Sequence, residues 1–366
     1  MDGIFCSNLL AIGRHAPTLD RLFYMYQLLD QWIGPYQANS YTFYLVLLWL
    51  GVIFGLYLLT KGGDWLSEHS ANLANILGVP PVVIGLTVVS IATSMPELFT
   101  SVSALRSNSP GLVLGNIIGS NIANIGLIFG VSLLLGPIQT DGAVSKPQRA
   151  CLLILTLTFC GILFYHPRGE LGTTAGNLFV LFISIYLVVV AKHALQGKQG
   201  MGNLPAEVKQ VTDSSAPNLL VSLAMLLVAT LTLWIGSDSL VYGSKNLAHL
   251  AGVPEELIGF TLIALGTSLP ELAASISLVR KQHTAMLLGN IVGSNLFNLA
   301  LIGGIAGILG PVRCATPRPW VDYLFLLGIT FLLVHWLRGK DLGKKHGLLL
   351  LSLYLGACIT TWLLNS

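Results

Sequence analysis

The stretch TSMPELFTSVSALRSNSPGLVLGNIIGSNIANIG at 93–126 returns later in the chain as TSLPELAASISLVRKQHTAMLLGNIVGSNLFNLA at 267–300. The full repeat pairs 85–138 with 259–312 without a gap, and 24 of its 54 positions are identical. Each copy carries one glutamate, Glu97 or Glu271, in an otherwise apolar stretch. A charge inside a membrane span is costly and usually functional. The matched pair therefore indicates one site shared by two repeats.

Composition places the chain in the membrane. Hydrophobic residues make up 54% and charged residues 10%, against about 25% charged residues in soluble domains. Apolar stretches of about 20 residues, the length that crosses a bilayer, recur along the chain. The sequence predicts an all-α membrane protein whose surroundings are the lipid bilayer, with no nucleic-acid partner. We expect ten spans, at 41–60, 80–106, 110–136, 147–165, 173–195, 217–243, 254–280, 284–310, 319–338 and 345–364.

The duplication extends upstream of the two copies, because residues 63–80 resemble residues 237–254 and pair Asp64 with Asp238. Each repeat then holds five spans, and an odd number gives the second repeat the opposite orientation in the membrane. Predicted boundaries are 1–40 for an N-terminal extension, 41–195 for the first repeat, 196–216 for a cytoplasmic linker and 217–366 for the second repeat. In the extension, residues 18–33 fit either an amphipathic interfacial helix or a weakly ordered segment.

Basic residues orient the predicted spans. With the N-terminus outside, eleven lysines and arginines fall in inside loops and four in outside loops. This bias agrees with the positive-inside rule, although Arg14 and Arg21 in the N-terminal tail weaken it slightly. Ten spans then put the C-terminus outside as well.

Prolines mark the centre of each copy. Pro96 and Pro270 disturb the preceding turn of helix and free carbonyl groups there, so we expect broken helices in spans 2, 3, 7 and 8. Groups freed in hydrocarbon need partners, and a cation can supply one. Thr93 and Thr267 lie one turn before the glutamates, which places their hydroxyls near the carboxylates.

The glycine-rich runs supply an opposing wall. Ser120 and Asn124 lie one turn apart, as do Ser294 and Asn298. Such residues often join membrane helices by hydrogen bonds, but their recurrence at positions matched to the glutamates favours ion ligands. Carboxylate, hydroxyl, carboxamide and carbonyl oxygens suit Ca²⁺ or Na⁺. The scattered cysteines are interpreted as apolar fillers, and no cofactor is expected.

Charge balance indicates exchange. Two glutamates carry −2, which one Ca²⁺, two Na⁺ or two protons would neutralise, and buried net charge is what costs most. Asp64 and Asp238 are interpreted as interfacial anchors or gate residues near helix ends, and not as ligands.

These motifs resemble the cation/calcium antiporter family, and within it the prokaryotic sodium/calcium-exchanger-like branch. The resemblance covers roughly 41–364 and implies that spans two, three, seven and eight surround the cation sites near the midplane. It implies that spans one and six slide to alternate access, in a prokaryotic inner membrane. It assigns Ca²⁺ and Na⁺ to Glu97 and Glu271, hydroxyls to Thr93, Thr267, Ser120 and Ser294, with Ser94 and Ser268 nearby, carbonyls to Ser90 and Ala264, and a central position to Asn124 and Asn298.

Two departures from the family pattern stand out. Asn298 occupies a position where several relatives carry Asp, which argues against K⁺ co-transport. Ala92 stands where the second copy has Gly266. The Gly-Asn motifs lack the acid that is usual in the proton-exchanging branch, which favours Na⁺ as the counter-ion.

The predicted function is a secondary antiporter that exchanges Ca²⁺ for Na⁺, and the ten-span plan is compatible with a monomer. Ca²⁺/H⁺ antiport is the alternative, because glutamates titrate when partly desolvated. A cation channel is the alternative from another class. No catalytic motif such as H-E-x-x-H occurs, so an enzyme is not expected.

Overall fold

The structure is a computed structural model that describes residues 24–36, 40–106, 110–140, 142–166, 169–200, 218–251, 264–313 and 320–365. Within these residues the fold is almost entirely helical, as predicted. Seven helices are long and apolar enough to cross a membrane, at Tyr41–Leu77, Pro81–Val102, Leu112–Leu135, Lys146–Tyr165, Thr173–Ala194, Leu219–Leu250 and Thr284–Leu309. In the described residues the other three predicted spans correspond to α13 (Ala264–Thr267) with α14 (Leu269–Arg280), to α17 (Trp320–Trp336) and to α18 (Lys344–Asn365). The chain is therefore an integral membrane protein.

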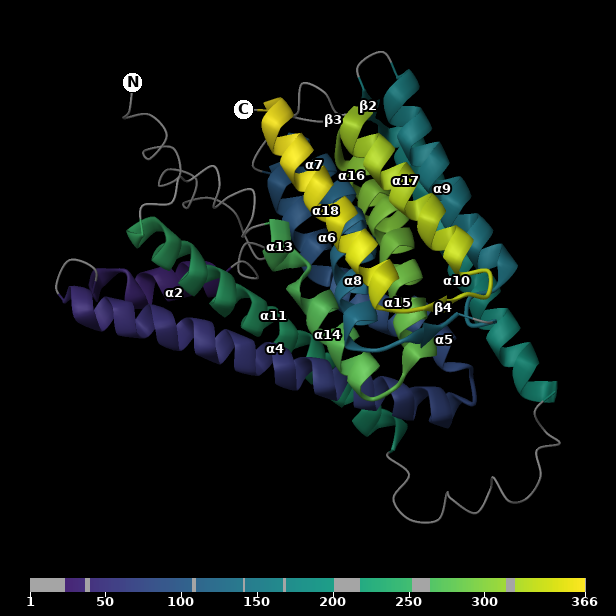
Figure 1. Cartoon of the computed structure of the whole chain (residues 1–366), viewed down its shortest axis with the longest axis horizontal. Helices are drawn as coiled ribbons and strands as arrows, with labels where there is room; N and C mark the ends of the chain where they lie inside the picture. Colours follow the sequence, from purple (N-terminus) through teal and green to yellow (C-terminus); the bar gives the residue numbers. More distant parts are fainter. Residues whose placement is uncertain are drawn as a thin grey trace.

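The first half of the chain begins with a short helix and continues with a long one (Figure 1). Its elements are α2 (Tyr24–Ile33), α4 (Tyr41–Leu77), α5 (Pro81–Ile84), the π-helical segment η3 (Gly85–Val89), α6 (Ser90–Arg106), α7 (Pro110–Ala123), the π-helical segment η4 (Asn124–Phe129), α8 (Gly130–Leu135), β1 (Ile138–Gln139), α9 (Lys146–Tyr165), β2 (Glu170–Leu171) and α10 (Thr173–Gly200).

The second half repeats this order. Its elements are α11 (Leu219–Leu250), α13 (Ala264–Thr267), α14 (Leu269–Arg280), α15 (Thr284–Leu296), the π-helical segment η8 (Phe297–Ile302), α16 (Gly303–Leu309), β3 (Val312–Arg313), α17 (Trp320–Trp336), β4 (Asp341–Leu342) and α18 (Lys344–Asn365).

Burial separates inner helices from outer ones. In the α7–η4–α8 helix 78% of the span is buried, and in α15–η8–α16 the share is 83%. The corresponding share is 22% for α4 and 28% for α11. Large apolar side chains point outward on the outer helices, for example Phe54 on α4 and Leu227 on α11. An apolar exterior around a core that holds polar residues is what a lipid environment requires.

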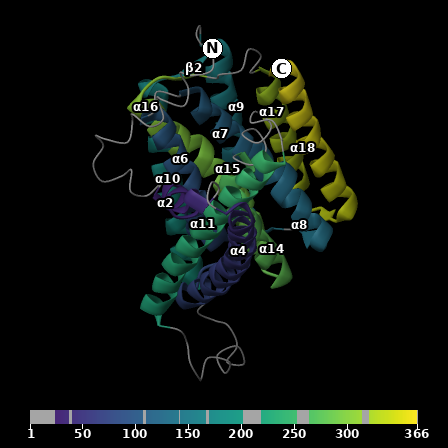
Figure 2. The ribbon, with the colours of Figure 1, turned by 90° about the vertical axis from the view of Figure 1, so that its left-hand side faces the viewer.

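The two long helices α4 and α11 pack along each other and cross the other helices obliquely, as both views show (Figures 1 and 2). Glycines allow the close approach. A Cβ at Gly55 would lie 2.7 Å from the carbonyl oxygen of Gly236, and one at Gly236 would lie 3.0 Å from the carbonyl oxygen of Gly55. Small residues at a crossing let membrane helices gain van der Waals contact that larger ones prevent.

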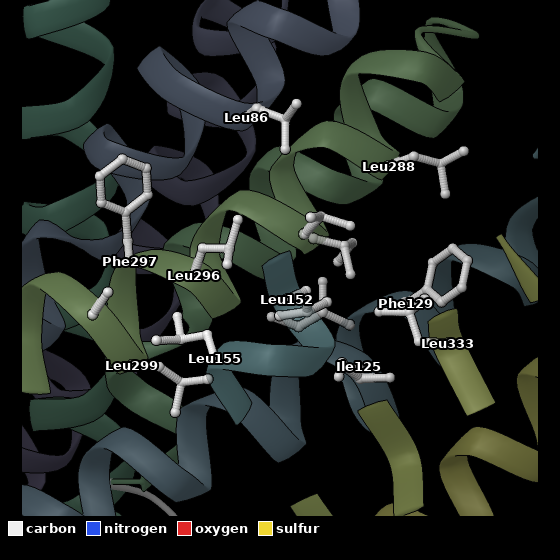
Figure 3. Packing of buried hydrophobic residues seen from close by; sticks show 14 of the residues in the cluster. Leu86, Ile125, Phe129, Leu152, Leu155, Leu288, Leu296, Phe297, Leu299 and Leu333 are labelled. Carbon is white, nitrogen blue, oxygen red and sulfur yellow. The ribbon is translucent and has the colours of Figure 1, made fainter. Parts of the chain in front are cut away.

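The hydrophobic core forms around α15 and η8, where side chains from both halves of the chain interleave (Figure 3). Leu86 of η3 packs near α15, and Leu155 of α9 lies close to Leu296 and Leu299. The backbones of η3 and α15 approach closely, because a Cβ at Gly289 would lie only 2.4 Å from the carbonyl oxygen of Val82. The core therefore joins the two repeats and does not separate them.

Two short antiparallel clips also join the halves. Strand β1 pairs with β4, with Ile138 opposite Leu342, and β2 pairs with β3, with Leu171 opposite Val312. Ile138 and Val312 are equivalent positions of the sequence repeat. The β2–β3 clip lies at the upper end of the bundle in Figure 1 and β4 lies toward the lower end. Equivalent strands thus lie toward opposite ends of the helices.

Several predicted boundaries were wrong. The span predicted at 41–60 is the first part of a helix that runs to Leu77, and the one predicted at 217–243 continues to Leu250. The part of α4 beyond residue 60 packs against α14, where Asp64 bonds Ser277. Helix α10 continues to Gly200, into the first residues of the predicted 196–216 linker. Most of the predicted linker and of the N-terminal extension lies outside the described residues.

The predicted helix in the extension is present in part as α2. Its residues Leu29 and Ile33 pack on a small cluster formed by Tyr44, Leu48 and Tyr242 of the long helices. This segment therefore lies against the α4–α11 pair.

Broken helices were predicted in spans 2, 3, 7 and 8. Within the described residues, only the helix of span 7 is interrupted by a non-helical residue. Spans 2, 3 and 8 stay helical through the π-helical segments η3, η4 and η8. Pro96 lies inside α6 without ending it. In span 7 the helix is interrupted at Ser268, which has φ −92° and ψ 3°. A π segment shifts the carbonyl register by one residue and is frequent at functional sites.

Candidate cation-binding site

Glu97 and Glu271 lie inside the bundle, on α6 and α14, and each is 1% exposed. Each glutamate accepts a hydrogen bond from the serine that lies three residues before the other glutamate. The Ser94 hydroxyl donates to Oε1 of Glu271 at 3.1 Å, and the Ser268 hydroxyl donates to Oε1 of Glu97 at 3.5 Å. Ser94 and Ser268 are equivalent positions of the repeat. The two copies thus exchange the same contact, which brings the predicted glutamates and serines into one place.

The pair of carboxylates is electrostatically incomplete. The two groups lie close enough to repel each other. The second oxygen of each, Oε2, is buried and has no hydrogen-bond partner within the described part of the chain. Thr93, one turn before Glu97, donates to the carbonyl of Val89 at 3.1 Å and also lies near Glu271. Two buried carboxylates without a nearby cation are unfavourable unless an ion neutralises them.

The opposing wall carries further unpaired oxygens. Ser120 of α7 and Asn124 of η4 are buried, as is Asn298 of η8. Among the described residues, no partner reaches the Ser120 hydroxyl or either side-chain atom of Asn124 and Asn298. Helix α6, with Glu97, packs against η8, and α14, with Glu271, packs against η4. Each glutamate helix therefore lies against the asparagine segment of the other repeat.

Ser294, Ser90 and Ala264 complete the predicted set. Ser294 donates to the side-chain oxygen of Asn290 at 3.3 Å. Ser90 donates to the Gly85 carbonyl at 2.7 Å and lies within 3.1 Å of the Asn290 carbonyl, so it joins the first repeat to α15. Ala264 is the first residue of α13. The roles of the Ser90 and Ala264 carbonyls as ligands remain predictions.

Asn116 is closer to the glutamates than the sequence suggested. The sequence alone predicts a helix-break or packing residue at this position of the Gly-Asn pair, and not an ion ligand. Its amide group donates to the Glu97 carbonyl at 3.1 Å and to the Ser101 hydroxyl at 3.0 Å, and its oxygen accepts from Thr267 at 3.5 Å. Asn116 therefore positions α6 and α13 together. Its place in the repeated Gly-Asn pair was the sequence signal that could have indicated this.

The chemistry of the cluster is that of hard oxygen ligands. Carboxylates, hydroxyls and carboxamides face one another, and among the described residues no group of three or more His, Cys, Asp or Glu gathers anywhere. A site for Zn²⁺ or Cu²⁺ would need imidazole or thiolate. Ca²⁺ and Na⁺ accept the donors that are present, and a net charge of −2 matches one divalent ion.

Asp64 and Asp238 were predicted to lie near helix ends. The prediction was wrong, because both lie well inside α4 and α11. Asp64 accepts a hydrogen bond of 2.7 Å from the Ser277 hydroxyl of α14, and its carbonyl accepts one of 2.7 Å from Nζ of Lys281. Lys281 also lies 3.7 Å from Glu68. These contacts, which we call the Lys281 latch, tie α4 to the helix that carries Glu271.

Known proteins resemble the chain over most of its length. The family model for the sodium/calcium exchanger protein matches residues 47–192 and 221–363. The uncharacterized membrane protein MJ0091 of Methanocaldococcus jannaschii is 34% identical over 303 residues, which cover 83% of this chain and 94% of that protein. The sodium/calcium exchanger MaX1 of Methanosarcina acetivorans is 30% identical over 332 residues, which cover 83% and 95%.

A solved structure of the sodium-calcium exchanger NCX_Mj, soaked with 10 mM Na⁺ and 10 mM Sr²⁺, aligns with a TM-score of 0.72 at 28% identity. The alignment covers 86% of this chain and 98% of that one. The family match, the relatives and the shared fold agree with one another. The chain belongs to the sodium/calcium exchanger family of transmembrane antiporters.

Proposed function

We propose that this protein exchanges Ca²⁺ for Na⁺ by alternating access at one site built around Glu97 and Glu271. One observation carries the proposal: both carboxylates keep a buried oxygen without a partner in the described residues, beside Ser120, Asn124 and Asn298, whose oxygens are also unpaired. Buried polar groups are normally satisfied. A dehydrated cation would satisfy all of these oxygens at once.

The same charge arithmetic favours exchange over simple binding. One Ca²⁺ or two Na⁺ each neutralise two carboxylates, so either occupant makes the closed site nearly neutral. An unoccupied site retains −2 in a low-dielectric interior, which is costly. Switching the access of the site from one side of the membrane to the other is therefore easier with an ion bound than without one. Coupling of the two fluxes follows from this difference.

The proposed architecture is ten spans in two inverted repeats, with boundaries at 41–195 and 217–366. Support comes from the two clips, which exchange equivalent strands between the halves, and from the exchanged Ser–Glu hydrogen bonds. The long helices α4 and α11 are the proposed moving pair. With basic loops inside, both termini lie outside, in a prokaryotic inner membrane.

Sodium is the proposed counter-ion. Asn298 and Asn124 supply neutral amides at the centre, and the Gly-Asn motifs add no acid that could carry a proton. The glutamates themselves are the groups through which protons would compete, because a carboxylate in a low-dielectric site binds protons more readily.

The test uses purified protein in liposomes loaded with Na⁺ and diluted into Na⁺-free buffer that contains ⁴⁵Ca²⁺. A second set replaces the Na⁺ gradient with an outward proton gradient. We expect uptake with the Na⁺ gradient and not with the proton gradient. Uptake driven by protons alone would assign the protein to Ca²⁺/H⁺ exchange, and Ca²⁺ flux without any counter-gradient would indicate a channel.

A further inference from the structure

A third carboxylate, that of Asp238, faces a cavity beside the site of Glu97 and Glu271. The cavity has a volume of about 330 Å³, many times the roughly 15 Å³ that one water molecule needs. Its lining residues include Pro96, Gly266 and Thr267, which belong to the two glutamate motifs, and Asp238 of α11. The cavity therefore adjoins both halves of the proposed ion site.

Asp238 differs from its repeat equivalent in what holds it. The carboxylate of Asp64 accepts a hydrogen bond from Ser277. For the Asp238 carboxylate no hydrogen bond or ion pair is found with any residue that the structure describes. Its neighbour Ser237 donates elsewhere, to the Gly266 carbonyl at 2.5 Å. Lys245, which also lines the cavity, already interacts with another group.

The cavities beside the two aspartates differ in volume. The one beside Asp64 has a volume of about 160 Å³ and is lined by leucines, alanine and isoleucine together with Thr60, Ser277 and Arg280. The one beside Asp238 is about twice as large, and its wall includes Thr100 and Thr267 beside Phe99, Trp234 and Lys245. Both walls carry one basic residue, so what favours a cation beside Asp238 is the larger volume and a carboxylate that has no partner among the described residues.

We propose that the Asp238 cavity is a vestibule in which this carboxylate binds an incoming cation before it passes Thr267 and Pro96 to the glutamates. The ligand class is a partly hydrated Ca²⁺ or Na⁺. A negative group in a low-dielectric cleft concentrates cations and raises their rate of entry. In the orientation proposed above, this vestibule faces the outside. The inference rests on the proposed exchange function.

The experiment measures ⁴⁵Ca²⁺ uptake in right-side-out and inside-out vesicles, so that KM and kcat are obtained for each face. For Asp238→Asn we expect KM to rise about tenfold at one face only, with kcat and the other face unchanged. The rise should shrink when choline chloride screens the charge. Asp238→Glu should restore the parental KM.

Asp64→Asn is the matched control, because it removes the charge at the equivalent position while its amide oxygen can still accept the Ser277 hydrogen bond and its carbonyl still accepts from Lys281. It should leave KM at the Asp238 face unaltered. An unchanged KM in Asp238→Asn, an equal rise at both faces, or a fall in kcat alone would overturn the vestibule. Parental protein that shows no Ca²⁺ uptake at either face would instead refute the exchange function, and the vestibule with it.

Discussion

The two halves of this protein share a sequence pattern but differ in how their access helices are held. In the first half, Asp64 of α4 is fixed by the Ser277 hydroxyl, and Lys281 bonds its carbonyl. In the second half, Asp238 of α11 faces a cavity about twice as large. A duplicated motif thus supplies two equivalent positions, while the contacts around each position differ: one aspartate is held by a partner and the other lines a larger cavity.

The difference has an identifiable origin in the sequence. The residue equivalent to Lys281 in the first copy is Ser107, and the residue equivalent to Glu68 in the second half is Tyr242. The second half therefore lacks both charged members of the latch. In the proposed alternating-access cycle, a latch on one side alone would bias the equilibrium toward the state in which that side is shut.

The largest effect is expected where the halves are most alike. Glu97→Gln and Glu271→Gln should each reduce Na⁺-driven Ca²⁺ uptake by roughly 100-fold or more, because a single remaining carboxylate cannot neutralise a buried divalent ion. Uptake of ⁴⁵Ca²⁺ into liposomes measures this. Asp341→Asn, at an exposed position of the β1–β4 clip, is the control and should transport normally. If only one glutamate variant lost transport, the two would not form one shared site.

A smaller effect should distinguish the glycines of the two copies. Gly289→Ala should destabilise the protein by about 1–3 kcal/mol, because the new Cβ would lie 2.4 Å from the Val82 carbonyl oxygen. Gly115→Ala is the matched variant at the equivalent position, where no described atom lies within 4 Å of a Cβ. Thermal unfolding in detergent measures both. Equal losses would show that the two interfaces are equally tight.

Removal of the Lys281 latch should raise the rate of a thiol reaction at the smaller cavity about fivefold. This factor corresponds to the free energy of roughly one hydrogen bond. Lys281→Met removes its contacts with Asp64 and Glu68. A cysteine placed at Ala273, which lines the smaller cavity, should then react faster with a thiol reagent in a background without native cysteines.

The control for the latch is Arg280→Gln, which removes the adjacent positive charge and leaves the latch intact. Burial and the nearby Lys281 lower the pKa of His283. At pH 7.5 this imidazole is therefore neutral, and its charge does not affect the measured thiol reaction rate. An unchanged reaction rate in Lys281→Met would show that the latch does not hold this side closed.

The smallest effects should separate the two clips. Thr140 supports the β1–β4 clip, since its hydroxyl donates to the Lys340 carbonyl at 2.8 Å and accepts from the Lys340 amide at 2.8 Å. Thr140→Val should cost about 1–2 kcal/mol. The β2–β3 clip carries instead the exposed ion pair of Arg313 with Glu170, at 2.6 Å.

Arg313→Gln should cost less than about 1 kcal/mol, and the loss should fade in high salt because the pair is screened. Thermal unfolding at low and high NaCl concentration measures both variants. A salt-dependent loss in Thr140→Val, or a larger loss in Arg313→Gln, would contradict the different chemistry assigned to the two clips.

Much of the site could be predicted because the repeat itself carries the information. Offset and residue type paired Glu97 with Glu271 and Ser94 with Ser268, and these side chains do meet across the repeats. The packing role expected of Asn116 agrees with its contacts, but local spacing does not show that its amide reaches the carbonyl of Glu97 on another helix. The extent of α4 was underestimated for a similar reason. Asp64 was placed near a helix end, because its partner on α14 cannot be identified from local sequence.

The sequence by itself determined the membrane environment, the duplication, the pair of carboxylates and the hard-oxygen character of the site. These properties depend on residue type and on spacing along one helix. Only the tertiary structure decided that the helices stay continuous through π-helical segments, that the repeats exchange strands and serine–glutamate bonds, and that Asp64 is held while Asp238 faces a cavity. Such features depend on contacts between residues some 130 to 220 positions apart, and side-chain packing, not local pattern, selects among them.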